Sequence, residues 1–418
     1  MIKKIIAGVC LIFSAAGFSQ ESNSSPYSYY GIGDVRFKGT VENKSMGGLG
    51  ILPDSIHVNL QNPASYSSLM FTTYSVGLST QTRNFKSDAG KDDAKRTTFD
   101  YLTVALPFNN FGFAIGLMPY TSVGYRIQDA DVVNGANIEK RFTGDGGINR
   151  AFFGMSYKIT PKLSAGADFQ YNFGDIETKS ILSAAGVQYR TRELNNSHYN
   201  GVSFNVGAIY QTKLKKLDWV SSFTFSPKST LKSTTDRNFA SILLTTSDNE
   251  IVVDQLDTRT FKDDVDMPSV FTVGTGFGEA RKWFAGLEFS TQGSNTLSGR
   301  FDQATNADFK AAQRISLGGY FIPKFNSFNS YLSRVTYRGG LRFENTGLVV
   351  NNQDIKDFAF TLGMGLPLGG NIGGSNLNIG FEMGRRGTTK SNLVQENYVG
   401  FMASLSINDR WFVKRKYN

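Results

Sequence analysis

The sequence is poor in the residues that build most compact sites, with one cysteine and two histidines among 418 residues. One cysteine excludes an intrachain disulfide framework. Three such side chains cannot supply the four ligands of a structural zinc or iron–sulfur site. No segment offers about 20 consecutive apolar residues, so no transmembrane helix is predicted. Charged residues are also scarce, at 19%, whereas aromatic residues reach 13% and glycines number 44. This composition disfavours a disordered chain and favours many strands.

The first twenty residues have the layout of a secretory signal peptide. Lys3 and Lys4 precede a mostly apolar run over residues 5–18 that ends in small residues. Such a run is too short for a membrane anchor and is typical of a cleaved export signal. We therefore predict a signal peptide over residues 1–20. Cys10 lies inside it, which leaves the mature chain without cysteine.

The chain carries a net charge of +9. A basic excess is compatible with nucleic-acid binding, but the signal peptide directs the chain out of the cytoplasm, so we predict no nucleic-acid partner. In the outer-membrane barrel that the strand pattern below predicts, basic residues more often contact lipid phosphates at the rims, and the tail at residues 414–416 fits this use. Outer-membrane lipid is therefore an expected partner.

From residue 70 onward, apolar side chains recur at every second position. Phe111, Phe113, Ile115 and Leu117, for example, alternate with small residues. This period of two predicts strands with one apolar face. The predicted strands are 70–83, 97–108, 111–127, 149–158, 162–174, 199–212, 217–228, 268–278, 282–293, 312–323, 332–345, 355–366, 375–386 and 396–407.

The connections between these fourteen strands alternate in length. Those after even-numbered strands are short, such as Asn109-Asn110, and those after odd-numbered strands are mostly longer, with residues 229–267 the longest. Short turns at one end and long loops at the other are typical of an outer-membrane barrel, and only closure satisfies every backbone group of a sheet in lipid. We predict an all-β, antiparallel transmembrane barrel of 14 strands over residues 70–418, in the bacterial outer membrane. A secreted β-propeller or sandwich is the soluble alternative.

Residues 21–69 precede the first strand and consist of turn-forming sequence with a few apolar anchors. A barrel of fourteen strands encloses a lumen wider than its own side chains can fill. We therefore predict that this segment folds into the lumen as a plug. A periplasmic tail is the alternative.

Two short motifs in this segment carry a family resemblance. Met46, Gly47, Gly48 and Gly50 form a Met-Gly-Gly-x-Gly element, and Asn62-Pro63-Ala64 follows just before the first strand. This arrangement resembles the N-terminal hatch of the FadL-like long-chain fatty-acid transporters. The opening at residues 25–34 and the ending at residues 408–416 look like a less-characterised branch of that family. The resemblance implies passage of hydrophobic molecules, although similar barrels also serve as non-transporting partners in secretion machinery.

Pro119 lies inside the third predicted strand. Proline cannot donate a ladder hydrogen bond, so it requires a bulge, a kink or an unpaired neighbour. In the resembled transporters a kink in the third strand opens the wall sideways, which implies a lateral opening near Pro119. A simple bulge is the alternative.

Charged side chains collect on the face of the strands opposite the apolar one. Arg314, Arg338 and Arg342 come from two predicted neighbouring strands. A charge facing lipid would cost about 2–4 kcal/mol near the midplane, so these side chains should point into the lumen. They could bind the carboxylate head group of a ligand. Structural ion pairs between plug and wall are the alternative.

The sequence predicts no catalytic constellation, no metal site and no cofactor. His57 in the plug and His198 in a long connection have no readable nucleophile or carboxylate partner. The favoured function is passage of hydrophobic small molecules such as fatty acids across the outer membrane. The alternative is an accessory barrel in an outer-membrane secretion or assembly complex, with other envelope proteins as partners.

Overall fold

The computed structural model describes residues 24–133, 135–245, 247, 249–294, 306–368 and 374–411. The predicted signal peptide and the basic tail at residues 414–416 lie outside these residues. No helix in the described part of the chain is long and apolar enough to cross a membrane.

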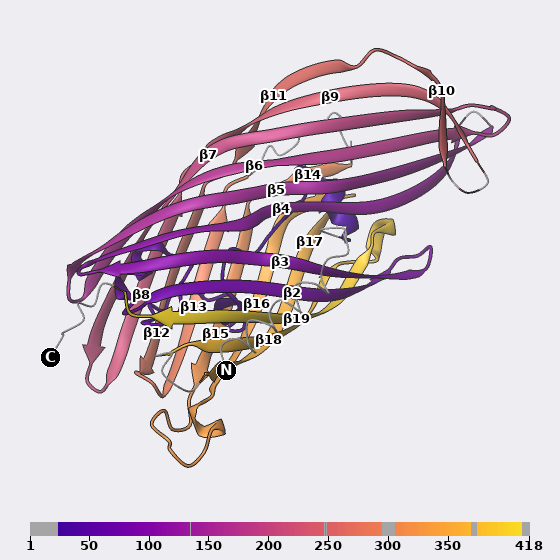
Figure 1. Cartoon of the computed structure of the whole chain (residues 1–418). Helices are drawn as coiled ribbons and strands as arrows, with labels where there is room; N and C mark the ends of the chain where they lie inside the picture. The colour runs from indigo at the N-terminus through magenta and orange to yellow at the C-terminus, as the bar shows by residue number, and fades with distance from the viewer. Residues whose placement is uncertain are drawn as a thin grey trace.

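A single antiparallel sheet closes on itself, because β19 pairs with β2 from Asp409↔Thr72 to Gln395↔Lys86 (Figure 1). β8 with β9, and β11 with β12, each serve as one strand of the wall, whereas β10 and β14 are side extensions. The ring therefore contains fourteen strands, as predicted. Its elements are β2 (Thr72–Lys86), β3 (Lys91–Phe108), β4 (Phe111–Val133), β5 (Ala136–Thr160), β6 (Leu163–Ala184), β7 (Arg190–Leu214), β8 (Leu217–Ser226), β9 (Ser229–Leu244), β10 (Glu250–Gln255), β11 (Arg259–Met267), β12 (Val270–Glu279), β13 (Trp283–Gln292), β14 (Ala307–Phe309), β15 (Ala312–Phe321), β16 (Thr336–Val350), β17 (Gln353–Pro367), β18 (Asn376–Gly387) and β19 (Gln395–Asp409).

The alternation read from the sequence separates an apolar outward face from a polar inward face. On β13, Leu287 and Phe289 are exposed on the outside, whereas Glu288 and Ser290, which alternate with them, are buried on the lumen side. An apolar exterior around a polar interior is the arrangement that lipid requires of a barrel.

The two ends of the barrel differ in how far their hairpins extend. The prediction of long loops at one end was wrong, because most of those residues form strands. Residues 229–267, expected to be the longest loop, instead form β9, β10 and β11, and the connection at 128–148 belongs to the hairpin of β4 and β5. Polar residues interrupt the regular apolar alternation in these stretches, and their backbone is satisfied by pairing with neighbouring strands. Figure 1 shows these hairpins projecting past the one formed by β2 and β3. We call this the long-hairpin end, and the opposite one the short-turn end.

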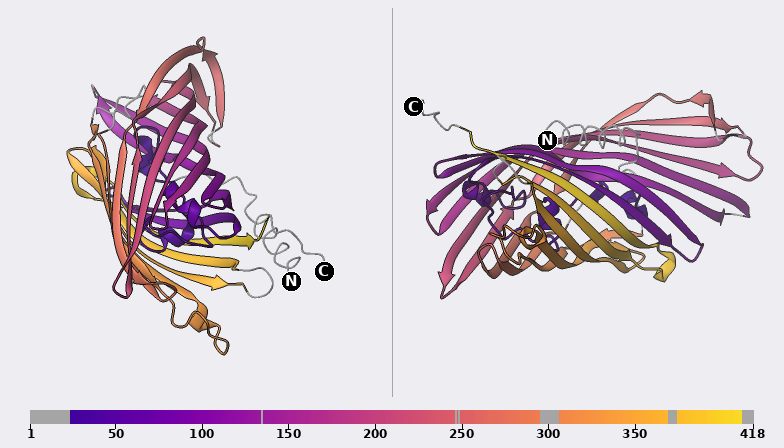
Figure 2. Two further views of the ribbon diagram at one scale, coloured as in Figure 1. Left: turned by 90° about the vertical axis from the view of Figure 1, so that its left-hand side faces the viewer. Right: turned by 60° about the horizontal axis from the view of Figure 1, so that its bottom comes forward.

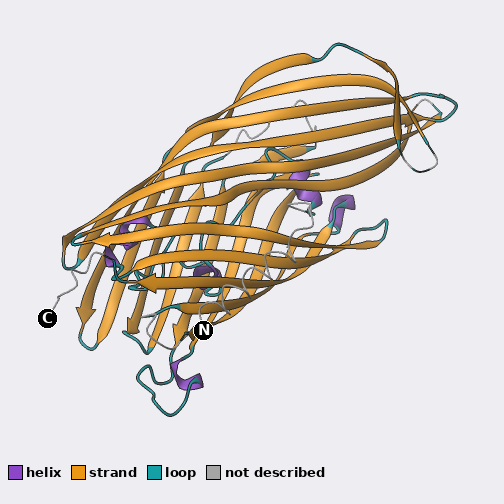
Figure 3. Ribbon diagram, in the orientation of Figure 1, coloured by secondary structure: helices purple, strands orange, loops and turns teal. Residues whose placement is uncertain are grey.

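The N-terminal segment, residues 24–69, contains four short elements that lie within the barrel (Figures 2 and 3). They are η1 (Pro26–Tyr29), β1 (Asp34–Val35), α2 (Val41–Lys44) and η2 (Pro63–Ser68). The side chains of Ser25, Thr40 and Asn62 cap the three helical turns by accepting backbone N–H groups. Two further turns, η3 (Leu332–Arg334) and η4 (Lys390–Asn392), belong to connections of the barrel.

The wall is split between β3 and β4. Their pairing runs from Phe108↔Phe111 only as far as Leu102↔Leu117, although both strands continue toward the long-hairpin end. Beyond this point β1 pairs with β4 at Val35↔Thr121, and the Arg36 N–H donates to the Tyr120 carbonyl at 2.8 Å. The N-terminal segment thus completes the sheet where β3 leaves it.

Candidate functional site in the lumen

The Met-Gly-Gly-x-Gly element is the point at which the N-terminal segment contacts one side of the wall. Gly47 and Gly48 adopt φ values of 70° and 91°, which favour glycine. The Gly47 N–H donates to Thr361 Oγ1 at 2.9 Å, and the Gly50 N–H donates to Glu288 Oε2 at 2.8 Å. These bonds join the segment to β17 and β13.

The Met46–Gly50 turn packs against glycines of the barrel wall. A Cβ on Gly318 would meet the Met46 carbonyl oxygen, and a Cβ on Gly340 would meet the Gly47 nitrogen. Backbone therefore packs directly on backbone between the segment and strands β15 and β16. Glycine is therefore favoured on both sides of this contact, by positive φ at Gly47 and Gly48 and by lack of space for a Cβ at Gly318 and Gly340.

Amide side chains of the segment itself hold the turn from its other side. Asn43 Nδ2 donates to the Leu49 carbonyl at 2.7 Å, Asn59 Nδ2 to the Gly50 carbonyl at 2.7 Å, and Gln61 Nε2 to the Gly48 carbonyl at 2.9 Å. These bonds satisfy carbonyls that a sharp turn would otherwise leave open.

The Asn-Pro-Ala motif contacts a different part of the wall. Asn62 Oδ1 accepts the Ala64 N–H at 3.0 Å, which begins η2. Asn62 Nδ2 lies 3.3 Å from both the Ala208 and Phe223 carbonyls, on β7 and β8. A Cβ on Gly166 would lie 2.7 Å from the Pro63 carbonyl, so the backbone of η2 packs directly against the backbone of β6. The two motifs thus fix the segment on strands β13 to β17 and on β6 to β8.

A buried polar cluster joins α2 to the wall. Lys44 Nζ lies 3.0 Å from Glu382 Oε2, and Asn378 Nδ2 donates to Glu42 Oε1 at 2.6 Å. His57 Nδ1 lies 2.8 Å from Asp54 Oδ2, and its Nε2 lies 3.8 Å from Glu42 Oε1. His57 therefore has carboxylate partners, Asp54 within its own turn, which the sequence analysis did not identify. No cluster of three or more metal-ligating residues suited to an ion occurs in the described part of the chain.

The three predicted luminal arginines point inward but do not form one site. Arg314 Nη2 lies 3.7 Å from Glu288 Oε1. Arg342 Nη2 lies 3.0 Å from Glu382 Oε1 and 3.6 Å from Asp357 Oδ1. Arg338 Nη1 donates to Asn378 Oδ1 at 3.0 Å and does not line the cavity that the other two share. The arginines therefore belong to separate polar contacts.

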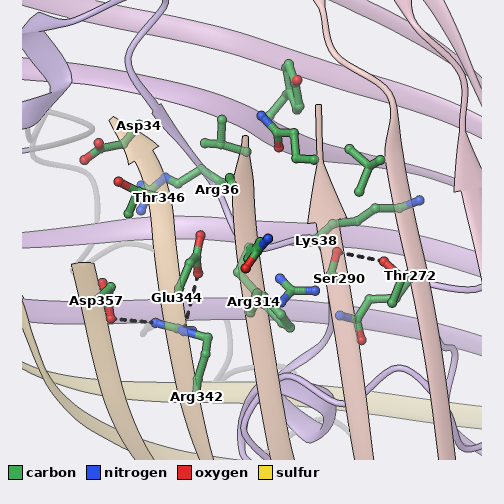
Figure 4. Close-up of a pocket in the computed structure, with 18 of the residues that line it drawn as sticks. Asp34, Arg36, Lys38, Thr272, Ser290, Arg314, Arg342, Glu344, Thr346 and Asp357 are labelled. Atoms are coloured by element: carbon green, nitrogen blue, oxygen red, sulfur yellow. Dashed lines mark hydrogen bonds and ion pairs between the residues drawn. The ribbon is translucent and has the colours of Figure 1, made fainter. Parts of the chain in front are cut away.

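That shared cavity, which we call the vestibule, is drawn in Figure 4. On β15 it is lined by residues 312–314, nearer the long-hairpin end than Gly318, on which the Met46–Gly50 turn packs. Ten Lys or Arg side chains line it, against five Asp or Glu side chains. Figure 4 shows Arg36 and Lys38 of the N-terminal segment facing it together with Arg314 and Arg342 of the wall. Its lining therefore carries a net positive charge.

Pro119 lies at the split in the wall. The register between β4 and β5 shifts between Pro119 and Thr121, as expected for a proline within a strand. The last pair between β3 and β4, Leu102↔Leu117, lies two residues away. Beyond Leu117, β4 no longer pairs with β3 and pairs with β1 instead. A lateral opening near Pro119 therefore remains a proposal.

Comparisons with known proteins agree with this architecture. The family model BamG matches residues 1–418. No curated protein matches the chain in sequence. Among solved structures, the toluene transporter TbuX of Ralstonia pickettii matches with a TM-score of 0.57 at 13% identity, covering 89% of this chain and 99% of that one.

Two further structures have the same fold. A FadL homologue of Pseudomonas aeruginosa gives a TM-score of 0.58 at 10% identity, covering 91% of this chain and 99% of its own. The toluene transporter TodX of Pseudomonas putida gives 0.53 at 15% identity, covering 89% and 98%. At these identities the likeness concerns the fold. A closed barrel with an apolar outward face belongs in the bacterial outer membrane, as predicted.

Proposed function

We propose that this chain, which belongs to the BamG family, is a non-transporting accessory subunit of an outer-membrane protein complex, the Bam assembly machinery. The family name supports envelope proteins as partners. Passage of hydrophobic molecules, which the FadL-like fold also suggests, is the second candidate.

The observation that carries the proposal is the anchoring of the N-terminal segment across the lumen. Its Met46–Gly50 turn is bonded to β13 and β17, and Asn62 is bonded to β7 and β8. Tyr66 adds a hydrogen bond to Asp168 Oδ1 at 3.0 Å. A segment held on several strands by buried bonds cannot move aside without breaking them together, so it suits a permanent filling better than a gate.

The vestibule also fits poorly with passage of a hydrophobic molecule. Ligand pockets for such molecules are lined mostly by apolar and aromatic side chains. A hydrophobic ligand that enters the vestibule from the long-hairpin end would pass ten cationic side chains and five carboxylates. Moving a hydrophobic ligand from water into the vestibule would therefore gain little of the free energy that burial against apolar side chains provides.

The long-hairpin end offers a surface for a protein partner. On β6, the outward Tyr171 is followed by the exposed charges Asp175 and Glu177, which mark where the strand leaves lipid. Leu182, eleven residues beyond Tyr171, lies about 36 Å further along the strand at a rise of about 3.3 Å per residue. Exposed apolar side chains nevertheless gather at this end. They are Val132, Leu182, Val187, Tyr189, Ile251, Val252, Val253 and Leu256.

Such a group, which we call the tip patch, has no lipid to contact at that height. We propose that these exposed apolar side chains contact a protein partner, because apolar surface left in water often marks such a site. β10 contributes Ile251 and Val253, which are 53% and 46% exposed, and it pairs only with β9 among the described strands. Apolar side chains on a strand of this kind favour a protein neighbour.

Affinity purification from native outer membranes tests the accessory role. We expect the tagged chain to co-purify with the barrel subunit of the assembly machinery at near-equal stoichiometry, without a hydrophobic small molecule in lipid extracts. A chain that elutes alone and carries a stoichiometric apolar ligand would overturn the proposal and support passage.

The tip patch should contribute to partner binding. Ile251→Asp combined with Val253→Asp removes two exposed aliphatic side chains, each worth about 1.5–3 kcal/mol when buried. We expect co-purified partners to fall at least tenfold while the barrel still resists heat in detergent. Lys262→Asp, at an exposed position of β11, introduces a carboxylate outside the patch and should leave partner yield unchanged. Equal yields from all three proteins would exclude the patch.

A disulfide lock separates the two candidate functions. A Cβ on Gly207 would lie 3.0 Å from Asn62 Cγ, so cysteines at these positions are within reach of a disulfide. The only natural cysteine, Cys10, lies in the predicted signal peptide. For an accessory subunit, Asn62→Cys with Gly207→Cys should give equal partner yield with and without dithiothreitol.

If the chain instead passes hydrophobic molecules through its lumen, the same disulfide should have a different effect. Uptake of a labelled fatty acid would then depend on the chain, fall on oxidation and return with dithiothreitol. The single variant Asn62→Cys, treated identically, controls for the oxidant. Uptake that follows the redox state of the double variant alone would establish a moving plug.

A further inference from the structure

The connection between β15 and β16 is long for the short-turn end. Asn109-Asn110, Pro161-Lys162 and Lys215-Lys216, at the same end, contain two residues each, whereas this connection spans residues 322–335 and contains η3. Figures 1 and 3 show it projecting from the barrel. We call residues 322–335 the Phe328 loop. Short turns face the periplasm in outer-membrane barrels, so this loop is periplasmic and lies at the opposite end from the tip patch.

Hydrogen bonds connect the Phe328 loop to itself and to its neighbours. The Ile322 N–H donates to the Lys282 carbonyl at 2.6 Å, and the Lys324 N–H donates to the Ser333 carbonyl at 2.8 Å. The Tyr331 hydroxyl donates to the last carbonyl of β17 at 3.1 Å. The loop is therefore held by the strands on both sides of it, and little conformational entropy is left to lose when it binds a partner.

Four apolar side chains of the Phe328 loop are exposed. Phe328 is 99% exposed, Leu332 66% and Tyr331 44%. Phe325 is also exposed, although the Arg281 guanidinium carbon lies 4.9 Å from its ring centre. A phenylalanine that stands free in water adds no burial energy to the fold. It is suited to a pocket on another molecule, because aromatic side chains that fill pockets dominate the energy of protein interfaces.

The charge around these side chains is positive. Arg281, Lys324 and Arg334 form no ion pair with any described residue, whereas Lys282 Nζ lies 2.5 Å from Glu279 Oε1. Arg281 and Lys324 are exposed on the two connections, next to the apolar side chains. A partner with carboxylates around an apolar pocket would complement this surface.

A membrane surface fits the Phe328 loop less well. Phe328 lies between Asn326-Ser327 and Asn329-Ser330. If the ring entered lipid, these polar side chains and the irregular backbone that carries them would lose water without gaining partners, which is costly. In a protein pocket the ring alone is buried, because the polar groups beside it can stay in water or bond to the rim of the interface.

We propose that the Phe328 loop docks on a periplasmic protein that offers an apolar pocket bordered by carboxylates. Phe328 fills the pocket, and Arg281 and Lys324 contact its acidic border. The loop and the tip patch lie at opposite ends of the barrel, so the two contacts can be tested separately.

Photo-crosslinking in native outer membranes tests the contact. The photoreactive residue p-benzoylphenylalanine replaces Asn326 in one protein and Lys162 in a second, which is a control in another turn of the same end. We expect the probe at position 326 to crosslink one periplasmic protein at least tenfold more than the probe at position 162. Mass spectrometry should place the crosslinked peptide beside apolar residues and carboxylates of that protein.

Variants connect the crosslink to the loop. Phe328→Ser should reduce the yield from position 326 at least tenfold, because the anchor is lost. The barrel should still resist heat in detergent, since the ring is 99% exposed and packs on nothing in the fold. Lys324→Glu should reduce the yield at least threefold, whereas Lys162→Glu, an exposed charge reversal in the other turn, should leave it unchanged.

A crosslink from position 326 to phospholipid alone would overturn the proposal and make the loop a membrane contact. A yield no higher than that from position 162 would overturn it as well. So would a protein crosslink that Phe328→Ser leaves unchanged, or one that lies on a basic surface of the partner.

Discussion

Replacing Gly340 with valine is expected to release the N-terminal segment from the wall. A Cβ at this position would clash with the Gly47 nitrogen and the Met46 carbonyl carbon, both of them backbone atoms. No side-chain rotation can relieve such an overlap, so the turn must move away and lose its bonds to Thr361 and Glu288. Overpacking of this kind costs about 1–3 kcal/mol, and the lost buried hydrogen bonds add to it.

Two measurements check this result. Protease should cleave residues 24–69 of Gly340→Val at least tenfold faster than in the natural chain, and urea unfolding in phospholipid vesicles should show a lower free energy of unfolding. Gly339→Ala is the matched control, because its Cβ would meet the Leu362 side chain at 3.7 Å and the Thr361 carbonyl oxygen at 3.9 Å, both at ordinary contact distance. Equal protection of the segment in both variants would show that the Met46–Gly50 turn is not held by this contact.

The barrel itself could be predicted from the sequence because lipid imposes a simple rule. Each strand must turn one face outward, so alternation such as that of Phe111, Phe113 and Ile115 identifies it. The rule ends where the strand leaves the lipid. Beyond Tyr171 the β6 strand has water on its outer face, and alternation no longer distinguishes a paired strand from a loop. This is why residues 229–267 were predicted as a loop.

The candidate site was only partly predictable, for a different reason. The parity of Arg314 and Arg342 predicts the inward face of the wall, and both residues line the vestibule. Arg36 and Lys38, which face the vestibule, were not singled out, because their position depends on where the N-terminal segment crosses the lumen. That path is set by the pairing of β1 with β4 and by the split after Leu117. A single sequence carries no local signal for either.

The largest electrostatic effect is expected at Arg342. Its guanidinium faces three carboxylates, with distances of 3.0 Å to Glu382, 3.6 Å to Asp357 and 3.8 Å to Glu344. Arg342→Met fills a similar volume but leaves these acids without their shared cation. Removing one partner of a buried ion pair costs about 3–5 kcal/mol. The lower end of that range is expected, because Lys44 still lies 3.0 Å from Glu382.

Urea unfolding in phospholipid vesicles measures this loss, and a second substitution shows its origin. Arg342→Met combined with Glu382→Gln should be less destabilised than the sum of the single variants, because the unpaired charge at position 382 is gone. Arg385→Met, at an exposed position of β18, should change the free energy of unfolding by less than about 0.5 kcal/mol. If Arg342→Met behaves like Arg385→Met, the carboxylates are neutralised in some other way, and the network does not hold β16, β17 and β18 together.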